Sequence, residues 1–181
     1  MTQATAETLA DALPHVLAAP KDDAPIRTLC FRRGFGKRDF RDSLTLTVAE
    51  GVPGERWMKH PWMKLADGSP DPRIQISILG TRVVEAVVTE PEMLHPGDTI
   101  VADMDFSEEN LPVGTRLRIG TAVVEVSDLW NDACVKWKKR YGKPAFDWIR
   151  APGHAELRLR GVLCRIVEDG EVTLADRIRK I

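Results

Sequence analysis

The chain has 181 residues, and its 26 Lys and Arg against 27 Asp and Glu give a net charge of −1. A nearly neutral chain has no overall attraction to nucleic acid or anionic lipid, so any affinity for anions must come from local clusters of cations. The length and the apolar share of 43% are sufficient for one hydrophobic core, and we expect one main domain.

The cysteines and the amino-terminal segment indicate the compartment. Cys30, Cys134 and Cys164 are too few for a disulfide framework, and no pair has CxxC spacing. A reducing cytosol suits such a set. The first residues have neither a basic start nor a long apolar core, so no signal peptide is expected, and no apolar run approaches the length of a membrane span. We therefore expect a cytoplasmic protein without a membrane partner.

Residues 1–20 have the spacing of a helix with one thin apolar stripe. Pro14 lies inside this stripe and predicts either a kink or the start of a second short helix. A helix with so little apolar surface has to pack on something larger. We expect residues 1–25 to form a helical extension, or a contact for a partner protein, and residues 26–181 to form the main domain.

Beyond residue 25, short apolar runs follow one another, separated by turn residues. They are 26–31, 44–48, 74–78, 83–88, 99–102, 116–119, 122–126, 157–167 and 172–174. Several of them alternate apolar with polar residues, which is typical of half-buried strands. A helix is expected from Asn131 or Asp132 to Gly142, and another short one from Pro144. Many short strands with a few short helices predict an all-β fold, a β-barrel.

Two loops have unusual composition. Residues 32–38 form a basic loop broken by glycine, and the segment from Trp57 to Pro72 is long for a compact domain. Long irregular loops are often functional. His60 in the second loop has no second histidine at metal-ligand spacing, so we do not expect a zinc site.

Cys134 is the leading candidate for chemistry. A cap at Asn131 or Asp132 would put it in the first turn of a helix, where free backbone N–H groups and nearby lysines favour a thiolate, although the Asp132 carboxylate opposes this. A thiolate attacks sulfur or ligates a soft metal. The alternative is a small buried apolar side chain, which is the common fate of a free cysteine. The residues alone leave both interpretations open.

The helix that follows Cys134 is strongly basic. Its cations are Lys136, Lys138, Lys139, Arg140 and Lys143. Trp137 and Tyr141 are four residues apart, so they share one helix face. Such a helix either binds a phosphate and a flat heterocycle, or it is a solvated face anchored by an aromatic stripe. Arg158 and Arg160 alternate on a predicted strand, where they would line an anion site or the wet side of a sheet.

Several segments, taken in order, resemble the MOSC domain, which occurs at the carboxyl end of molybdenum cofactor sulfurases, in small bacterial proteins and in amidoxime-reducing components. The segments are 51–57, 97–99, 107–114, 117–120, Cys134 with Lys136, 160–162 and 169–176. The resemblance covers roughly residues 26–181. It implies a pyruvate-kinase-barrel-like β-barrel with a cysteine in a pocket.

The resemblance also implies an activity. Members of the family are thought to carry sulfur as a persulfide on that cysteine or to bind the molybdenum cofactor, and one branch reduces N-hydroxylated compounds with molybdenum held by the cysteine. Cys134 matches this position, as catalytic residue and as molybdenum ligand if the cofactor binds. The candidate cofactor contacts are Arg56, Thr99, Asn131, Lys136, Lys138, Arg140, Arg158 and Arg160.

The same resemblance limits the cofactors and suggests partners. The aminotransferase-like half of the full sulfurases is missing, so no pyridoxal phosphate site is expected. No flavin, haem or iron–sulfur signature is present, so a reductase would need an electron-donor protein, and a cofactor-synthesis protein is another expected partner. Nucleic acid is not an expected partner, because no recognised nucleic-acid motif occurs.

Three departures from the family pattern favour an alternative function. The loop at residues 60–63 lacks the glycine pair of many small bacterial members, Thr99 replaces an asparagine, and Ala175 replaces a glycine in the closing turn. A non-catalytic barrel that binds a small anionic or pterin-like ligand, or a partner protein, would tolerate these losses.

Overall fold

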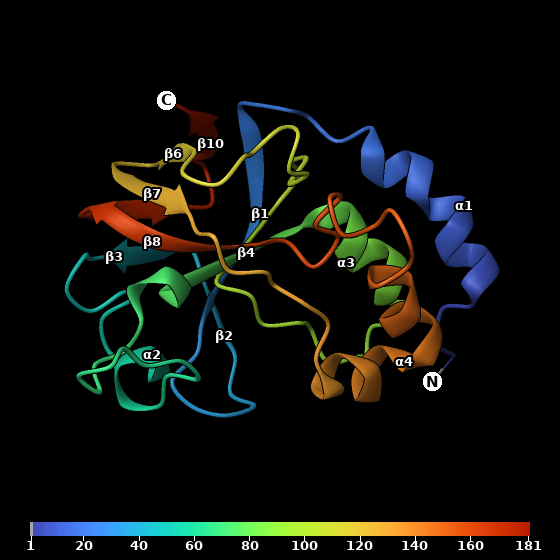
Figure 1. Ribbon diagram of the computed structural model, residues 1–181, viewed down its shortest axis with the longest axis horizontal. Coiled ribbons are helices and arrows are strands. Elements are labelled where there is room, and N and C mark those ends of the chain that lie inside the picture. The colour runs from blue at the N-terminus through green and yellow to red at the C-terminus, as the bar shows by residue number, and fades with distance from the viewer. Residues whose placement is uncertain (1) are drawn as a thin grey trace.

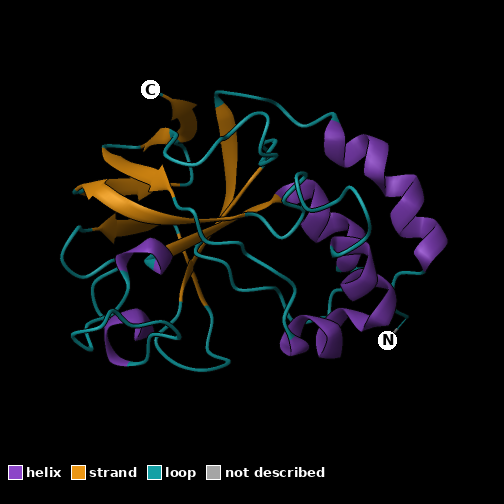
Figure 2. Ribbon diagram, in the orientation of Figure 1, coloured by secondary structure: helices purple, strands orange, loops and turns teal. Residues whose placement is uncertain are grey.

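The computed structural model describes residues 2–181, and its centre is a closed barrel of seven strands (Figures 1 and 2). The strands are β1 (Ala24–Phe31), β2 (Asp39–Arg41), β3 (Ser43–Leu46), β4 (Ile76–Gly80), β5 (Ile100–Ala102), β6 (Arg116–Ile119), β7 (Ala122–Val126), β8 (Val162–Glu168), β9 (Gly170–Thr173) and β10 (Arg177–Lys180). The helices are α1 (Ala6–Leu17), α2 (Arg56–Lys59), α3 (Thr81–Val87) and α4 (Val135–Ile149), with a 3₁₀ turn at Pro72–Ile74. The predicted all-β barrel with a few short helices is confirmed.

The barrel runs in the order β10, β6, β7, β8, β4, β5 and β1, and β1 closes it by pairing with β10. Only the β4–β5 pair of this ring is parallel. β2 continues the sheet beyond β1, while β3 and β9 form a separate antiparallel pair. In a closed ring each barrel strand has a neighbour on both sides, which satisfies the backbone groups that an open sheet would expose.

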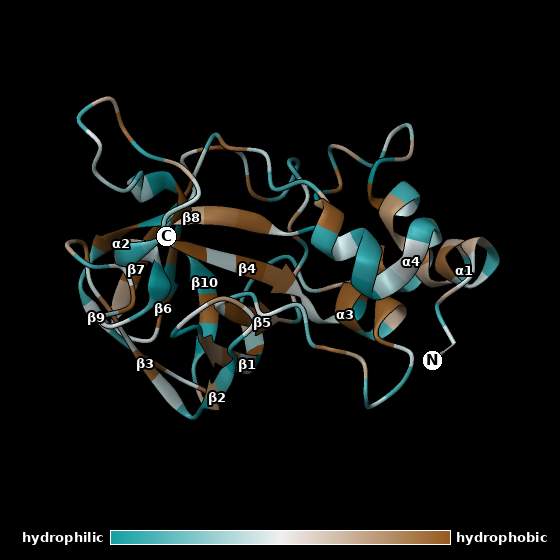
Figure 3. Cartoon of the chain, turned by 90° about the horizontal axis from the view of Figure 1, so that it is seen from below, coloured by the Kyte–Doolittle hydropathy of each residue, from teal (hydrophilic) through white to brown (hydrophobic). Residues whose placement is uncertain are grey.

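β4 is buried along its whole length because it belongs to two hydrophobic cores. Ile76 and Ile78 lie in the barrel core. Leu79 points to the other side and packs in a second core with Val83 of α3 and Trp137 of α4. Figure 3 shows β4 as a largely hydrophobic strand that runs from the barrel toward α3. The strand therefore fixes the helical layer to the barrel.

The helical layer differs from the sequence analysis at residues 81–87, which form α3, where no helix was expected. Valine is β-prone, but Val83 and Val87 are four residues apart, so a helix buries both on one face. α1 packs against α3 and α4, with Leu9 fully buried and Thr5 capping its first turn. Pro14 lies inside α1, which continues through it as one helix.

The predicted strand at residues 157–167 is wrong in its first half, because β8 begins at Val162. Arg158 has φ of 46° and Gly161 has φ of 75°, and both values are incompatible with a strand. A Cβ at position 161 would lie 2.0 Å from the Ile78 carbonyl oxygen, so the glycine lets the chain close tightly on β4. Arg158 and Arg160 therefore do not share a strand face.

The start of α4 also needs a correction. Cys134 is itself the N-cap residue rather than a member of the first turn. The Asp132 carboxylate, one of the two expected caps, instead accepts from the Ala133 N–H and pairs with Arg150. Gly142 interrupts the helix with φ of 89° and ψ of 172°, as its expected role as a stop predicts. Within residues 2–181, none of the helices has the length and apolar character needed to cross a membrane.

Candidate functional site

A cavity of about 960 Å³ lies where the barrel meets the amino-terminal end of α4. Most of its wall comes from four segments that are distant in sequence: 32–38, 55–64, 96–98 and 130–140. Ile74, Ser77, Arg160 and Leu163 complete it. In Figure 1 the loop after β1 and the α2 segment lie on the barrel side, and the start of α4 lies on the other. The barrel and the helical layer thus build the cavity together.

The cavity wall is rich in cations. Nine lining side chains are basic and three are acidic. The basic ones are Arg32, Lys37, Arg38, Arg56, Lys59, Lys64, Lys136, Arg140 and Arg160. The acidic ones are Glu55, Asp98 and Asp132. In a chain with a net charge of −1, this is the local clustering that anion binding requires.

The three carboxylates already have partners. Glu55 forms an ion pair with Arg32 at 2.9 Å, and Asp98 forms one with Arg160 at 2.8 Å. Burial by itself would raise the pKa of Asp98, but the guanidinium groups of Arg160 and Arg32 outweigh it, and the pKa lies below its usual value. These ion pairs compensate the charges of Arg32 and Arg160, whereas the other basic side chains of the wall form no ion pair within residues 2–181.

Arg38 and Arg140 converge on one backbone oxygen. Arg38 Nη2 donates to the Pro96 carbonyl at 3.1 Å, and Arg140 Nη1 donates to the same oxygen at 3.3 Å. Across residues 2–181, neither guanidinium has a carboxylate within 4.0 Å. Burial and the neighbouring charge of Arg140 lower the pKa of Arg38. Two like charges are therefore held together without a protein counterion.

The turn at residues 95–98 makes this arrangement possible. Gly97 has φ of 80°, and a Cβ there would lie 2.5 Å from Arg38 Nε, so a side chain would collide with the guanidinium. Its N–H donates to Nδ1 of His95 at 3.2 Å. Burial lowers the pKa of His95, which keeps the imidazole neutral and able to accept this bond. The turn thus provides the Pro96 carbonyl as a hydrogen-bond acceptor for Arg38, and Gly97 leaves room for the guanidinium.

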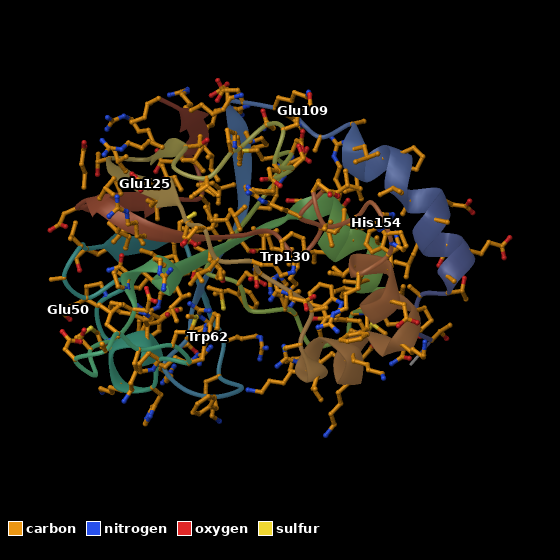
Figure 4. All side chains as sticks on the ribbon, viewed as in Figure 1. Glu50, Trp62, Glu109, Glu125, Trp130 and His154 are labelled. Atoms are coloured by element: carbon orange, nitrogen blue, oxygen red, sulfur yellow. The ribbon has the colours of Figure 1, made fainter. Side chains whose placement is uncertain are left out.

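Exposed aromatic side chains also line the cavity. Phe35 is 63% exposed, and its ring centroid lies 5.3 Å from Arg56 Cζ and 5.2 Å from Lys136 Nζ. Trp62 and Trp130, labelled in Figure 4, come from the loop after α2 and from the segment before α4, and both are exposed. These rings give the cavity an apolar surface beside its cations, which suits a ligand with a flat part and a charged part.

Cys134 lines the cavity and is exposed, while the other two thiols are buried. Burial raises the pKa of Cys30 to about 11 and raises that of Cys164 further. Cys164 lies in the barrel core, and Cys30 of β1 is fully buried near Arg32 and Arg38. Cys134 is therefore the thiol that a molecule in the cavity can reach.

Most of the residues predicted from the sequence come together here. Cys134, Arg56, Asn131, Lys136, Arg140 and Arg160 all line the cavity. Thr99 is fully buried behind the wall, where its hydroxyl accepts from Arg32 at 2.9 Å. Lys138 is outside, with its Nζ 5.4 Å from the Phe146 ring centroid, and Arg158 is outside, donating to the Leu111 carbonyl.

The stacking role suggested for Trp137 and Tyr141 is wrong. Both side chains are buried, with ring centroids 4.7 Å apart. Trp137 Nε1 donates to the Ala145 carbonyl, and the Tyr141 hydroxyl donates to the Leu94 carbonyl. Burial raises the pKa of Tyr141 to about 12. The aromatic stripe anchors α4 in the second core, as the alternative interpretation stated.

Sequence reasoning missed Arg38 and Phe35. Their loop was identified as basic and broken by glycine, but it was not linked to Cys134, which lies about a hundred residues later in the sequence. The usable signal was the combination of three arginines, one lysine and a glycine-flanked phenylalanine in a turn directly after a strand, since loops at strand ends carry many binding residues.

No protein-family model and no curated protein matches the sequence. Solved structures do match. YiiM from Escherichia coli aligns with a TM-score of 0.57 at 15% identity, over 86% of this chain and 69% of that one. The YuaD protein from Bacillus subtilis gives 0.56 at 18% identity, over 86% and 93%. A crystal structure of a hypothetical protein gives 0.61 at 16% identity, over 87% and 67%. At such identities the likeness concerns the fold, and it supports the MOSC-like barrel predicted from the sequence.

Proposed function

We propose that this barrel binds a molybdenum cofactor in the cavity, with Cys134 as the metal ligand or as a carrier of sulfur. One observation carries the proposal. The exposed thiol of Cys134 opens into the same cavity as Arg38 and Arg140, whose charges have no carboxylate partner among residues 2–181. A soft sulfur donor beside uncompensated cations matches a ligand that combines a soft metal with an anionic group.

The donor set of the cavity fits the cofactor. A cysteine thiolate is a suitable ligand for a soft metal centre. Arg38 and Arg140 use only some of their N–H groups on backbone carbonyls, so donors are left over for an anion. The exposed ring of Phe35 would support the flat pterin. When bound, the cofactor supplies the redox chemistry of molybdenum, while the residues of this chain bind it, orient it and hold it beside Cys134.

The sulfur-carrier role needs no metal in the transfer step. The Cys134 thiolate attacks the outer sulfur of a persulfide donor, R–S–SH. A new sulfur–sulfur bond forms at Cys134, the sulfur–sulfur bond of the donor breaks, and R–S⁻ leaves with the electron pair. Cys134 becomes Cys134–S–SH, and the donor becomes a thiolate.

The test is to express the full chain together with active molybdenum cofactor synthesis and to analyse the purified protein. We expect bound molybdenum, or one extra sulfur atom on Cys134 by mass spectrometry, in the wild type and in Lys138→Met. Cys134→Ser should lose both signals. Equal and negligible molybdenum in wild type and Cys134→Ser, together with no persulfide, would remove the proposal.

A second function is favoured by Thr99, which stands where the family has an asparagine. Its hydroxyl is turned into the wall, where it accepts from Arg32 and from the Ser77 N–H, and it is fully buried. The cavity would then be a non-catalytic module for a small anionic or pterin-like ligand. In that case Cys134→Ala should bind the ligand as well as the wild type does, and a large loss of affinity would contradict this alternative.

A further inference from the structure

We propose that Arg38 and Arg140 form a binding site for a single tetrahedral oxyanion, the phosphate group of a phosphate monoester, beside the turn at residues 95–98. The inference deepens the proposed function, because it assigns the part of the cavity that recognises the charged end of the ligand. It does not depend on Cys134 or on a metal, so the two proposals can fail separately.

Arg38 and Arg140 have more N–H donors than the surrounding protein uses. A guanidinium carries five N–H bonds. Arg38 uses Nη1 on the Gly36 carbonyl and Nη2 on the Pro96 carbonyl, which leaves Nε without a partner although it is buried. Arg140 uses Nη1 on the Pro96 carbonyl, and no other side-chain hydrogen bond of this residue occurs within residues 2–181. Even without the buried Nε, most N–H groups of the pair therefore have no partner in the described chain.

Arg38 and Arg140 are also held in a fixed orientation. Both side chains donate to the same oxygen, so the two guanidinium groups are fixed next to each other. They come from separate elements, the loop between β1 and β2 and the helix α4. Because both are anchored before a ligand arrives, binding requires little loss of side-chain freedom. Planar guanidinium groups match the oxygen geometry of phosphate, on which Arg can form paired hydrogen bonds.

The charges around Arg38 and Arg140 do not balance. The nearest acid in this turn, Asp98, is buried and paired with Arg160 at 2.8 Å. Its other oxygen, Oδ2, has no hydrogen-bond partner, yet Arg160 and Arg32 together compensate its charge. Arg38 and Arg140 are thus left with two positive charges and no neutralising group. A phosphate dianion brings the matching charge, whereas a single carboxylate brings half of it.

The location of the pair favours a small molecule over a macromolecule. Both guanidinium groups line the cavity and are half-buried, so the flat surface of a protein or a duplex cannot reach them. Phe35, with Arg56 and Lys136 close to its ring, lies in the same cavity and can contact the rest of the ligand. The pair would therefore hold the phosphate end of an organic molecule whose other end contacts this ring.

The test is a calorimetric titration of the full chain with inorganic phosphate at low salt. We expect one saturable site in the wild type. Losing one charge-assisted contact in Arg38→Met or Arg140→Met should weaken binding about tenfold. Lys138→Met and Lys139→Met remove a charge from the same helix outside the cavity, and we expect their affinity to stay within about twofold. Arg38→Lys serves as a second variant if Arg38→Met fails to fold.

Three results would overturn the site. They are no saturable phosphate binding by the wild type, unchanged affinity in both arginine variants, or an equal loss in the lysine controls, which would indicate general attraction. Acetate should not displace phosphate at comparable concentration, and effective displacement would contradict the selectivity for a dianion. Cys134→Ala should keep its phosphate affinity. If it does so while no sulfur or molybdenum is found on Cys134, the proposed function fails and this site stands.

Discussion

Arg32 and Glu55 form a buried two-pronged ion pair that joins the end of β1 to the start of α2. Glu55 Oε1 accepts from the backbone N–H and from Nε of Arg32, both at 2.9 Å, and Oε2 accepts from Nη2 at 2.9 Å. Arg32 Nη2 also reaches the Thr99 hydroxyl at the start of β5. One pair of side chains thus connects two segments of the cavity wall to Thr99 behind it.

This connection predicts a large effect of Glu55→Ala on stability. The substitution leaves the Arg32 charge in a largely buried position without its partner, which should cost about 3 kcal/mol of unfolding free energy in urea denaturation. Glu109 pairs with Lys21 on the surface (Figure 4), and Glu109→Ala should change stability by about 0.5 kcal/mol or less. Similar losses of unfolding free energy in the two variants would show that the buried ion pair stabilises the fold no more than the surface pair does.

The Asp98–Arg160 pair predicts how stability depends on pH. Asp98 has a folded-state pKa below its ordinary value of 3.8, so its contribution is complete above that value and is lost as pH falls through the folded pKa. Asp98→Asn should therefore be less stable than the wild type near neutral pH, and the difference should shrink in acid. Urea unfolding at a series of pH values measures both curves, and a constant difference would contradict the assignment.

The three thiols predict a simple labelling pattern. In the native protein one thiol, Cys134, should react with iodoacetamide at mildly alkaline pH, because Cys30 and Cys164 are buried and burial raises their pKa values. Cys134→Ala should remove the fast reaction, and unfolding in urea should expose the other two thiols. Peptide mass spectrometry identifies the labelled residue. Rapid native labelling of Cys30 would contradict the burial described here.

Gly97 predicts a coupling between backbone conformation and anion affinity. Gly97→Ala forces an alanine to φ of 80° and brings its Cβ within 2.5 Å of Arg38 Nε, so Arg38 has to move. We expect a loss of about 1–2 kcal/mol in stability, together with weaker phosphate binding. Gly114 has φ of 87° with no atom within 4 Å of a Cβ, so Gly114→Ala should lose stability without losing phosphate affinity.

Much of the barrel could be predicted from local sequence. In β6, for example, Leu117 and Ile119 are buried while Arg116 and Arg118 are exposed, as strict alternation predicts. Local alternation predicts the wrong element where a residue is buried by contacts with a helix or strand that is distant in sequence. The valines of residues 81–87 look like a strand in isolation, but they lie on a helix that buries Val83 and Val87 in the second core. The long-range packing that decides such cases is invisible in a window of a few residues.

The candidate site, like the barrel, could be predicted only in part from the sequence. The sequence by itself determined that Cys134 is followed by a basic helix, that its aromatic residues share one face, and that the chain carries turn glycines such as Gly97. Only the tertiary structure decided which cations are neutralised and which are free. Arg32 and Arg160 meet carboxylates, whereas Arg38 and Arg140 meet each other at the Pro96 carbonyl. Charge pairing depends on distances in space between distant segments, and closure of the barrel sets those distances.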